Sequence, residues 1–101
     1  MAKKHRLLAD LTADGTSPRL EIPEGGDYII SCANGIDFGG GTLTVEVYTQ
    51  DDQQLAGTSD LVFTDEFEPV VATLGYGTHL KATLSGSSSP SDFKIFISPA
   101  V

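Results

Sequence analysis

Ten consecutive residues, from Gly39 to Tyr48, constrain the fold of this chain more than any other stretch. Three glycines lead into seven residues in which polar and apolar side chains alternate strictly, and Leu43, Val45 and Val47 occupy the apolar positions. Successive side chains of a β-strand point to opposite faces of a sheet. The stretch therefore predicts a half-buried strand whose three aliphatic residues lie in the core.

The three glycines, residues 39–41, invite comparison with a phosphate-binding loop. Such a loop follows a strand and precedes a helix, whereas here a strand follows and no lysine lies nearby. We therefore expect the glycines to permit a bulge, a corner or a close approach of two backbones. Phe38, directly before them, is expected to fill part of the core.

The rest of the chain repeats this alternation in short segments separated by Gly, Pro and Asn, and no window carries an apolar stripe at helical spacing. This pattern predicts an all-β fold, an antiparallel β-sandwich or jelly roll of about seven to eight short strands with an N-terminal arm. Besides 42–49, strands are expected at residues 19–22, 28–32, 70–74, 78–85 and 92–98, with a short apolar run at 61–63.

Two local hairpins are expected within this pattern. In the first, strands 19–22 and 28–32 flank a tight connection that contains Gly25 and Gly26. In the second, the strand at 42–49 turns through a polar tip at 51–54 and returns along residues 54–56.

The charge of the chain is distributed unevenly. Lys3, Lys4 and Arg6 flank His5 at the start, whereas from residue 7 onward three basic residues face 14 acidic ones, a net charge of −11. The strong negative charge of residues 7–101 argues against nucleic acid or an anionic membrane as the main partner.

The length of 101 residues suits one domain. We expect a basic N-terminal arm over residues 1–10 and a single β-sandwich domain over residues 11–101. The apolar residues Leu7, Leu8 and Leu11 are expected to form either a first strand or an ordered part of the arm. The basic segment itself is either a docking element for an acidic surface or a solvated tail.

Cys32 is the sole cysteine, so the chain forms no internal disulfide, and its place in a strand-like run predicts a small buried apolar residue. The start of the chain lacks the apolar core of a signal peptide, and no apolar run reaches the length of a membrane span. We therefore expect a protein that is made and folded in a cytoplasm.

Residues suited to catalysis or metal binding are sparse. Nucleophilic catalysis needs a nucleophile beside a base, yet the only histidines are His5 and His79, which is expected to point outward from a strand. One cysteine and two distant histidines do not form a zinc site. Acidic residues gather at 51–52 and 60–68, but their spacing matches no calcium loop. The sequence predicts neither an enzyme nor a cofactor or metal site.

The outward faces of the strands carry apolar residues. Tyr48, Phe96 and Val71 have the wrong parity for the core, and one of the adjacent residues Ile29 and Ile30 must also face away. Such residues either complete a two-sided core or touch another subunit. We expect Tyr48, Phe96 and Tyr76, which lies between two glycines, to be subunit contacts in a homo-oligomer.

Two patterns in the chain resemble small virion structural proteins of tailed bacteriophages. The first is a glycine pair, a threonine, an alternating strand and an acidic turn; the second is a late hairpin made of an apolar strand, a Ser-Gly pair, a Ser/Pro loop and a final strand. The stretches that carry the resemblance are Gly26-Asp27-Tyr28, Gly40-Gly41-Thr42-Leu43-Thr44-Val45, Asp51-Asp52, residues 80–86, Ser89-Pro90 and Phe93-Lys94-Ile95.

This resemblance implies a non-enzymatic component of the particle, and most of all a head decoration (cement) protein. It implies attachment to the capsid surface, where the protein bridges major capsid protein subunits, and assembly as a homo-oligomer, with a trimer favoured. The capsid-docking arm is then expected to comprise Lys3, Lys4, His5, Arg6, Leu7 and Leu8.

Two other functions compete with this interpretation. One is a different virion part with the same domain, namely a head-fibre protein, a tail adaptor or a tail-tip module. The other is a carbohydrate-binding β-sandwich, which needs several exposed coplanar aromatic residues, whereas this chain has no Trp and only three Tyr.

Overall fold

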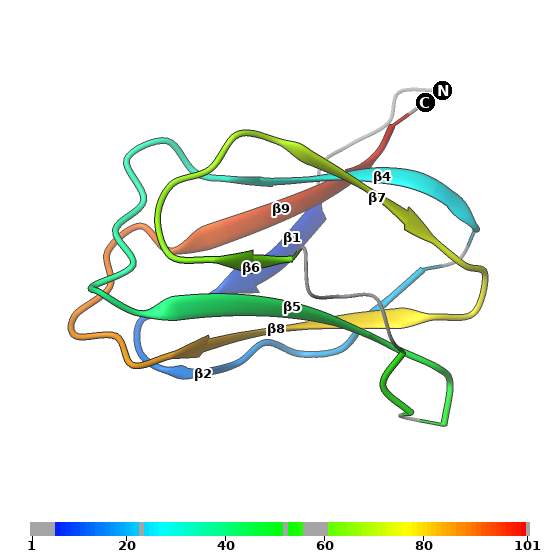
Figure 1. The fold of residues 1–101 in the computed structure, drawn as a ribbon, viewed down its shortest axis with the longest axis horizontal. Helices are drawn as coiled ribbons and strands as arrows, with labels where there is room; N and C mark the ends of the chain where they lie inside the picture. Colours follow the sequence, from blue (N-terminus) through cyan, green and yellow to red (C-terminus); the bar gives the residue numbers. More distant parts are fainter. Residues whose placement is uncertain (1–5, 23, 52, 56–60, 101) are drawn as a thin grey trace.

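The computed structural model describes residues 6–22, 24–51, 53–55 and 61–100. This part of the chain contains nine β-strands and no helix, and it confirms the all-β prediction. The strands form two antiparallel sheets packed face to face as a sandwich (Figure 1). They are β1 (Arg6–Asp10), β2 (Gly15–Thr16), β3 (Leu20–Glu21), β4 (Gly26–Cys32), β5 (Thr42–Tyr48), β6 (Val62–Phe63), β7 (Val70–Leu74), β8 (His79–Ser85) and β9 (Lys94–Pro99).

Sheet A has the strand order β1-β9-β4-β7, and sheet B has the order β2-β8-β5-β6, with β3 pairing β8 beyond β2. Strands β2 and β3 form one interrupted edge. Between them Ser17 donates its N–H to the Ala82 carbonyl (2.7 Å), and its buried Oγ accepts the Ala82 N–H (2.8 Å). The following Pro18 has no N–H to continue the ladder, so the strand breaks there.

The core lies between the sheets and follows the predicted alternation. Leu43 and Val45 of β5 are fully buried and Val47 nearly so, as expected. Phe38 is buried too, and its ring meets that of Phe93 edge to face, with 5.0 Å between centroids. Phe93, just before β9, and Ile95 and Ile97 within it are buried at alternate positions, which confirms the inward face of the strand predicted at 92–98.

The glycines before β5 allow the close backbone approach that was expected. Gly39 has a positive φ of 61°, and a methyl group added to it would overlap the carbonyl oxygen of Ser88. Its own carbonyl accepts the Ser88 N–H at 2.9 Å. At Gly41 an added methyl group would lie 2.8 Å from the Ser87 Cβ. The absence of side chains at these glycines thus lets the loop before β5 pack closely against the loop after β8 at one end of the sandwich.

The first predicted hairpin is wrong. Strand β3 pairs with β8 in sheet B, whereas β4 lies in sheet A between β9 and β7. The N–H of Ile22 bonds to the Thr78 carbonyl at 2.9 Å, so the chain stays with β8 until it crosses to the other sheet. The late hairpin implied by the resemblance is wrong for the same reason, because β8 and β9 belong to different sheets. Alternation identifies the inward face of a strand but not its neighbour.

The second predicted hairpin is confirmed over the described residues. Tyr48 and Gln54 form a bridge, and the Leu55 N–H donates to the Val47 carbonyl at 2.8 Å. Ala56, its predicted last residue, lies outside the described part of the chain.

The expected arm over residues 1–10 is corrected at its C-terminal half. Residues 6–10 form β1, an edge strand of sheet A paired with β9, and Leu8 and Ala9 are both buried. A bulge between Leu7 and Ala9 allows two adjacent side chains to enter the core, which simple alternation does not predict. Residues 1–5 lie outside the described part.

Candidate interaction surface

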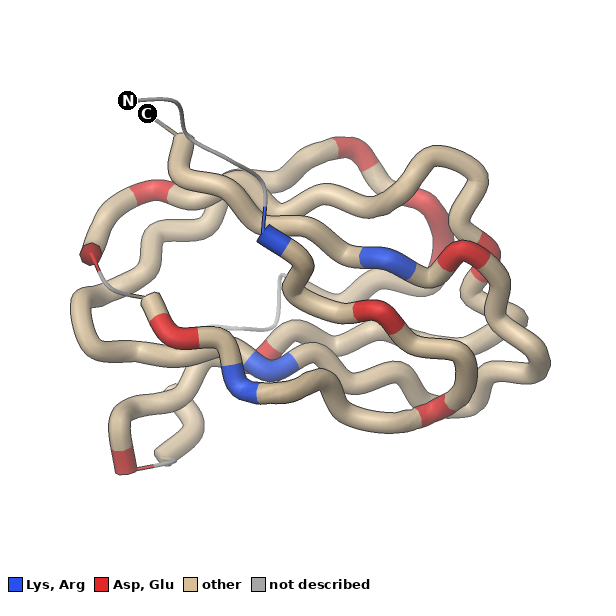
Figure 2. Tube along the Cα trace, turned by 180° about the vertical axis from the view of Figure 1, so that it is seen from behind, with Lys and Arg blue, Asp and Glu red and all other residues tan. Residues whose placement is uncertain are grey.

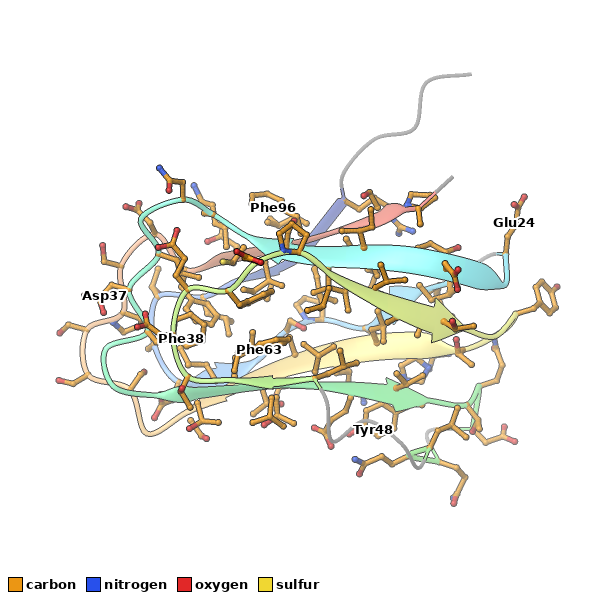
Figure 3. The ribbon with its side chains drawn as sticks, turned by 45° about the horizontal axis from the view of Figure 1, so that its top comes forward. Glu24, Asp37, Phe38, Tyr48, Phe63 and Phe96 are labelled. Atoms are coloured by element: carbon orange, nitrogen blue, oxygen red, sulfur yellow. The ribbon has the colours of Figure 1, made fainter. Side chains whose placement is uncertain are left out.

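The outer face of sheet A carries an apolar residue on each of its four strands, arranged as two opposed pairs with Ser31 and Ser98 beside them. The sheet A face, as we name it, comprises Leu7 of β1, Phe96 of β9, Ile29 of β4 and Val71 of β7. Leu7 lies opposite Phe96, and Ile29 lies opposite Val71. Such directly opposed pairs on one face of a sheet are close enough for their side chains to pack together. Leu7 is 48% exposed and Val71 65%, so the sheet A face is open to solvent in the isolated chain. Figure 3 shows the labelled Phe96 on this outer side of the sandwich.

Polar groups border the sheet A face at both ends. At one end Asp10 lies opposite Lys94. At the other end the Thr73 hydroxyl donates to an Asp27 carboxylate oxygen at 2.6 Å. An apolar centre with a polar rim is the usual composition of a protein–protein interface.

The outer face of sheet B differs in chemistry. Thr16, Thr44 and Thr83 lie side by side across three strands, and the hydroxyls of Thr16 and Thr83 are hydrogen-bonded at 3.0 Å. Next to them Glu46 lies opposite Lys81. Apart from the exposed Val62 of β6, which lies opposite Thr44, this face presents mainly hydroxyls and charges, so the two outer surfaces of the sandwich are suited to different contacts.

Tyr48 lies on the sheet B side, where its ring is engaged within the chain. It stacks on the buried His79 ring with 5.3 Å between centroids, and Lys81 Nζ lies 4.8 Å from its centre. His79 thus has the expected outward parity but is covered. The predicted role of Tyr48 as a subunit contact stays a prediction.

The other predicted contacts are dispersed. Phe96 is half-buried within the sheet A face, whereas Tyr76 projects from the turn between β7 and β8 and is 82% exposed. Arg6 donates to the Glu21 carbonyl at 3.3 Å, which links the two sheets at their edges. Leu8 is a core residue at 3% exposure, so its assignment to a docking arm is wrong. The arm residues Lys3, Lys4 and His5 lie outside the described residues.

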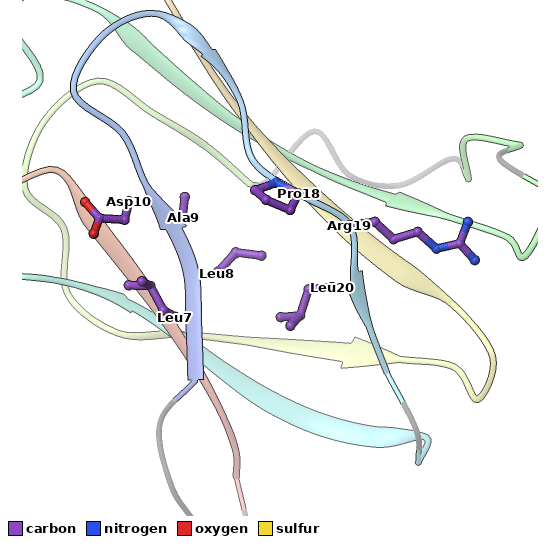
Figure 4. A pocket seen from close by; sticks show the side chains of 7 residues that line it. All are labelled: Leu7, Leu8, Ala9, Asp10, Pro18, Arg19 and Leu20. Atoms are coloured by element: carbon purple, nitrogen blue, oxygen red, sulfur yellow. The ribbon is translucent and has the colours of Figure 1, made fainter.

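An apolar groove lies beside Leu7, between the edge strands of the two sheets (Figure 4). Its volume is about 360 Å³, and one wall is β1 while the other is the segment 18–20. Sequence patterns did not indicate this groove, because it forms where edges distant in sequence come together. The lining residues are Leu7, Leu8, Ala9, Asp10, Pro18, Arg19 and Leu20.

Acidic side chains near the loops serve local structure. Asp14 accepts the N–H groups of Gly86 (3.0 Å) and Ser87 (2.9 Å), and it also accepts the Ser87 hydroxyl. The Ser87 hydroxyl, followed by the Ser87 N–H, holds the pKa of Asp14 below its usual range. In the predicted acidic segment, Glu66 accepts the Gly35 N–H at 3.3 Å. Within the described ranges no three His, Cys, Asp or Glu side chains converge on a common point suited to a metal ion.

Acidic positions outnumber basic ones along the described part of the chain and are spread over both sheets and the loops (Figure 2). Acidic residues occupy the loops at one end of the sandwich, among them Asp14, Asp37, Glu66 and Asp92.

Cys32 is half-buried, with its Sγ 3.5 Å from the backbone N and O of Phe67. None of the residues that the structure describes forms a helix long and apolar enough to cross a membrane.

No protein-family model, no curated protein and no solved structure matches this chain. Among the described residues, the apolar sheet A face with its neighbouring groove is the feature best suited to bind a partner.

Proposed function

We propose that this chain is a non-enzymatic structural protein of a tailed-bacteriophage virion, synthesised in the host cytoplasm and attached to the capsid surface. In this role it acts as a decoration, or cement, protein that bridges major capsid protein subunits. The observation that carries the proposal is the apolar sheet A face, exposed on a sandwich whose other outer face carries mainly hydroxyls and charges beside Val62 and Tyr48. Its association with a virion rests on the sequence resemblance.

The mechanism is mechanical. The sheet A face lies against the shell, where burial of Leu7 and Val71 removes apolar surface from water. The groove beside β1 accepts apolar side chains of an extended segment of a capsid subunit. Basic residues at the start of the chain meet acidic groups of the shell. Several such contacts in one homo-oligomer act together, so modest individual affinities give tight attachment.

A co-sedimentation experiment tests this proposal with a matched pair of variants. Capsids of the phage that encodes the chain are stripped of it, mixed with purified protein and pelleted. Leu7→Glu introduces a charge into the sheet A face, whereas Val62→Glu introduces the same charge on the sheet B side at nearly equal exposure, 46% against 48%. We expect Leu7→Glu to lower capsid binding at least tenfold and Val62→Glu to bind as the wild type does.

Equal binding of the two variants would show that the sheet A face is not the docking surface.

The number of copies per particle tests the location: a decoration protein is present in hundreds, whereas a handful of copies in purified tails would instead identify a head-fibre, tail-adaptor or tail-tip protein. The carbohydrate-binding alternative has less support, because Tyr76 is the one strongly exposed aromatic residue among those the structure describes, and Tyr48 is stacked on His79.

A further inference from the structure

Strand β7 is the most regular open edge of the sandwich. It pairs with β4 over five consecutive residues and has no second neighbour among the described strands. The other edges are blunted: β1 contains a bulge, β2 and β3 are separated at Pro18, and β6 has two residues. A regular, apolar open edge is a template for pairing with another strand.

The backbone groups that β7 presents to this edge follow from the hydrogen bonds of β4. Asp27 and Ala33 both form backbone hydrogen bonds on the β9 side of β4. The Ala100 N–H donates to the Asp27 carbonyl, and the Ala33 N–H donates to the Lys94 carbonyl. Because bonding alternates along an antiparallel strand, the even-numbered residues of β4 bond toward β7. Their partners there are Val70, Ala72 and Leu74.

It follows that Val71 and Thr73 direct their N–H and C=O groups away from β4, toward the open edge. An identical strand can use all four groups when the two run antiparallel about a two-fold axis at Ala72. Val71 of each copy then lies opposite Thr73 of the other. A register centred on Val71 would instead place Pro69, which has no N–H, opposite Thr73.

We propose that two copies of this chain associate through their β7 edges in this register and so join their A sheets into one continuous eight-stranded sheet. The contact is isologous, so it closes as a dimer rather than the trimer that the resemblance favours. The inference goes beyond the proposed capsid role and does not depend on it.

Charge favours the antiparallel over the parallel orientation of the two copies. Glu66 and Glu68 precede β7, and parallel pairing would bring these carboxylates of the two copies together. In the two-fold register Glu68 lies opposite Tyr76 of the second copy. The two Glu68 residues are then separated by eight residue positions, roughly 27 Å along the strands and well beyond the Debye length of about 8 Å.

In the same register, the exposed side chains on and near β7 contact the second copy. Tyr76, at 82% exposure, comes beside the Pro69–Glu68 segment of the second copy, and the exposed Val71 comes beside its Thr73. On the inner side, the half-buried Ala72 meets its equivalent and the half-buried Val70 lies opposite Leu74 of the second copy, so the core extends across the axis. An edge contact of five residues is small compared with stable interfaces, so the dimer forms reversibly, and salt strengthens it by screening the two acidic bodies.

Disulfide trapping tests the register directly. Ala72 faces itself across the axis in a non-hydrogen-bonded pair, for which the Cα separation is about 4.5 Å, within the range of disulfides. Ala72→Cys in a Cys32→Ala background should therefore form a covalent dimer under mild oxidation. Val71→Cys in the same background is the control: it is more exposed, but its equivalents are two positions out of register, roughly 8–9 Å apart. Equal crosslinking of the two variants, or more with Val71→Cys, would overturn the proposal.

Sedimentation velocity provides a second measurement without cysteine chemistry. Val71→Pro removes the outward N–H while sparing the bonds to β4, since proline is tolerated at the open side of an edge strand. Val71→Thr keeps the N–H and is the control. We expect the wild type and Val71→Thr to shift toward dimer with concentration, and Val71→Pro, its fold verified by circular dichroism, to stay monomeric. A wild type that is monomeric at about 100 μM, or trimeric, would contradict the inference.

The outcome is separable from that of the capsid proposal. The dimer is measured on the isolated protein, and Leu7→Glu, on the opposite edge of sheet A, should dimerise as the wild type does while losing capsid binding.

Discussion

Gly39→Ala should destabilise the domain much more than the same substitution at the adjacent Gly40. Both glycines have a positive φ, 61° and 79°, so alanine incurs a conformational cost of roughly 1–2 kcal/mol at either position. The lower backbone entropy of the unfolded alanine chain offsets about 0.4–1 kcal/mol of that cost. At Gly40 nothing lies within 4 Å of the added methyl group, and we expect a net loss of about 1 kcal/mol.

At Gly39 the added methyl group also overlaps the Ser88 carbonyl oxygen, and the backbone bearing that oxygen must move. Overpacking of this kind costs roughly 1–3 kcal/mol, so the total loss should be about 2–4 kcal/mol. For a domain of this size, each kcal/mol lowers Tm by about 4–8 °C, which predicts a decrease of roughly 10–30 °C for Gly39→Ala.

Thermal and urea unfolding monitored by circular dichroism measures both variants. The comparison is informative because the two residues share the turn and the sign of φ and differ in the space around them. Equal losses of stability, or a larger loss at Gly40, would refute the close approach between the loop before β5 and the loop after β8.

Two further predictions concern hydrogen bonds at other sites. Ser17→Ala removes the acceptor of the Ala82 N–H at a buried position and should cost about 1–3 kcal/mol in the free energy of unfolding, measured by urea titration; a loss below about 0.5 kcal/mol would contradict this role. Asp14→Asn should be less stable than the wild type at pH 7, because the carboxylate accepts charge-assisted bonds from residues 86 and 87. Folding lowers the Asp14 pKa below 3.8, so the stabilisation by the carboxylate is present above this value and is lost as the pH falls through the folded-state pKa. The difference in unfolding free energy between wild type and variant should therefore close in acid. A difference that stays unchanged below pH 3.8 would contradict this role of Asp14.

The sequence predicted the inward faces of the strands but not their neighbours. Alternation identified Leu43, Val45 and Val47 as core residues, because burial on one face of a sheet leaves a period of two. It carries no information about which strand lies alongside, and a tight glycine-containing connection suggested a hairpin where the chain crosses between sheets. Adjacent burial of Leu8 and Ala9 depends on a bulge, which shifts the parity and has no clear sequence signal.

The candidate interaction surface was predicted in part. Parity singled out Phe96, Val71 and one of the two isoleucines, and the structure brings these together on sheet A with Ile29 as the outward residue. Leu7 was assigned to the arm and joins the same face through β1. The groove and the open β7 edge depend on strand order, which local pattern does not determine.

The connectivity of the sandwich has a consequence for how the chain folds. Only the β2–β3 and β5–β6 connections stay within one sheet, and every other successive pair of strands is divided between the two. Most native pairings therefore join segments distant in sequence, so loop-closure entropy is lost before much apolar surface is buried. We expect folding in milliseconds to seconds, with a transition state that requires both sheets at once, because few parts of this chain can form a stable nucleus on their own.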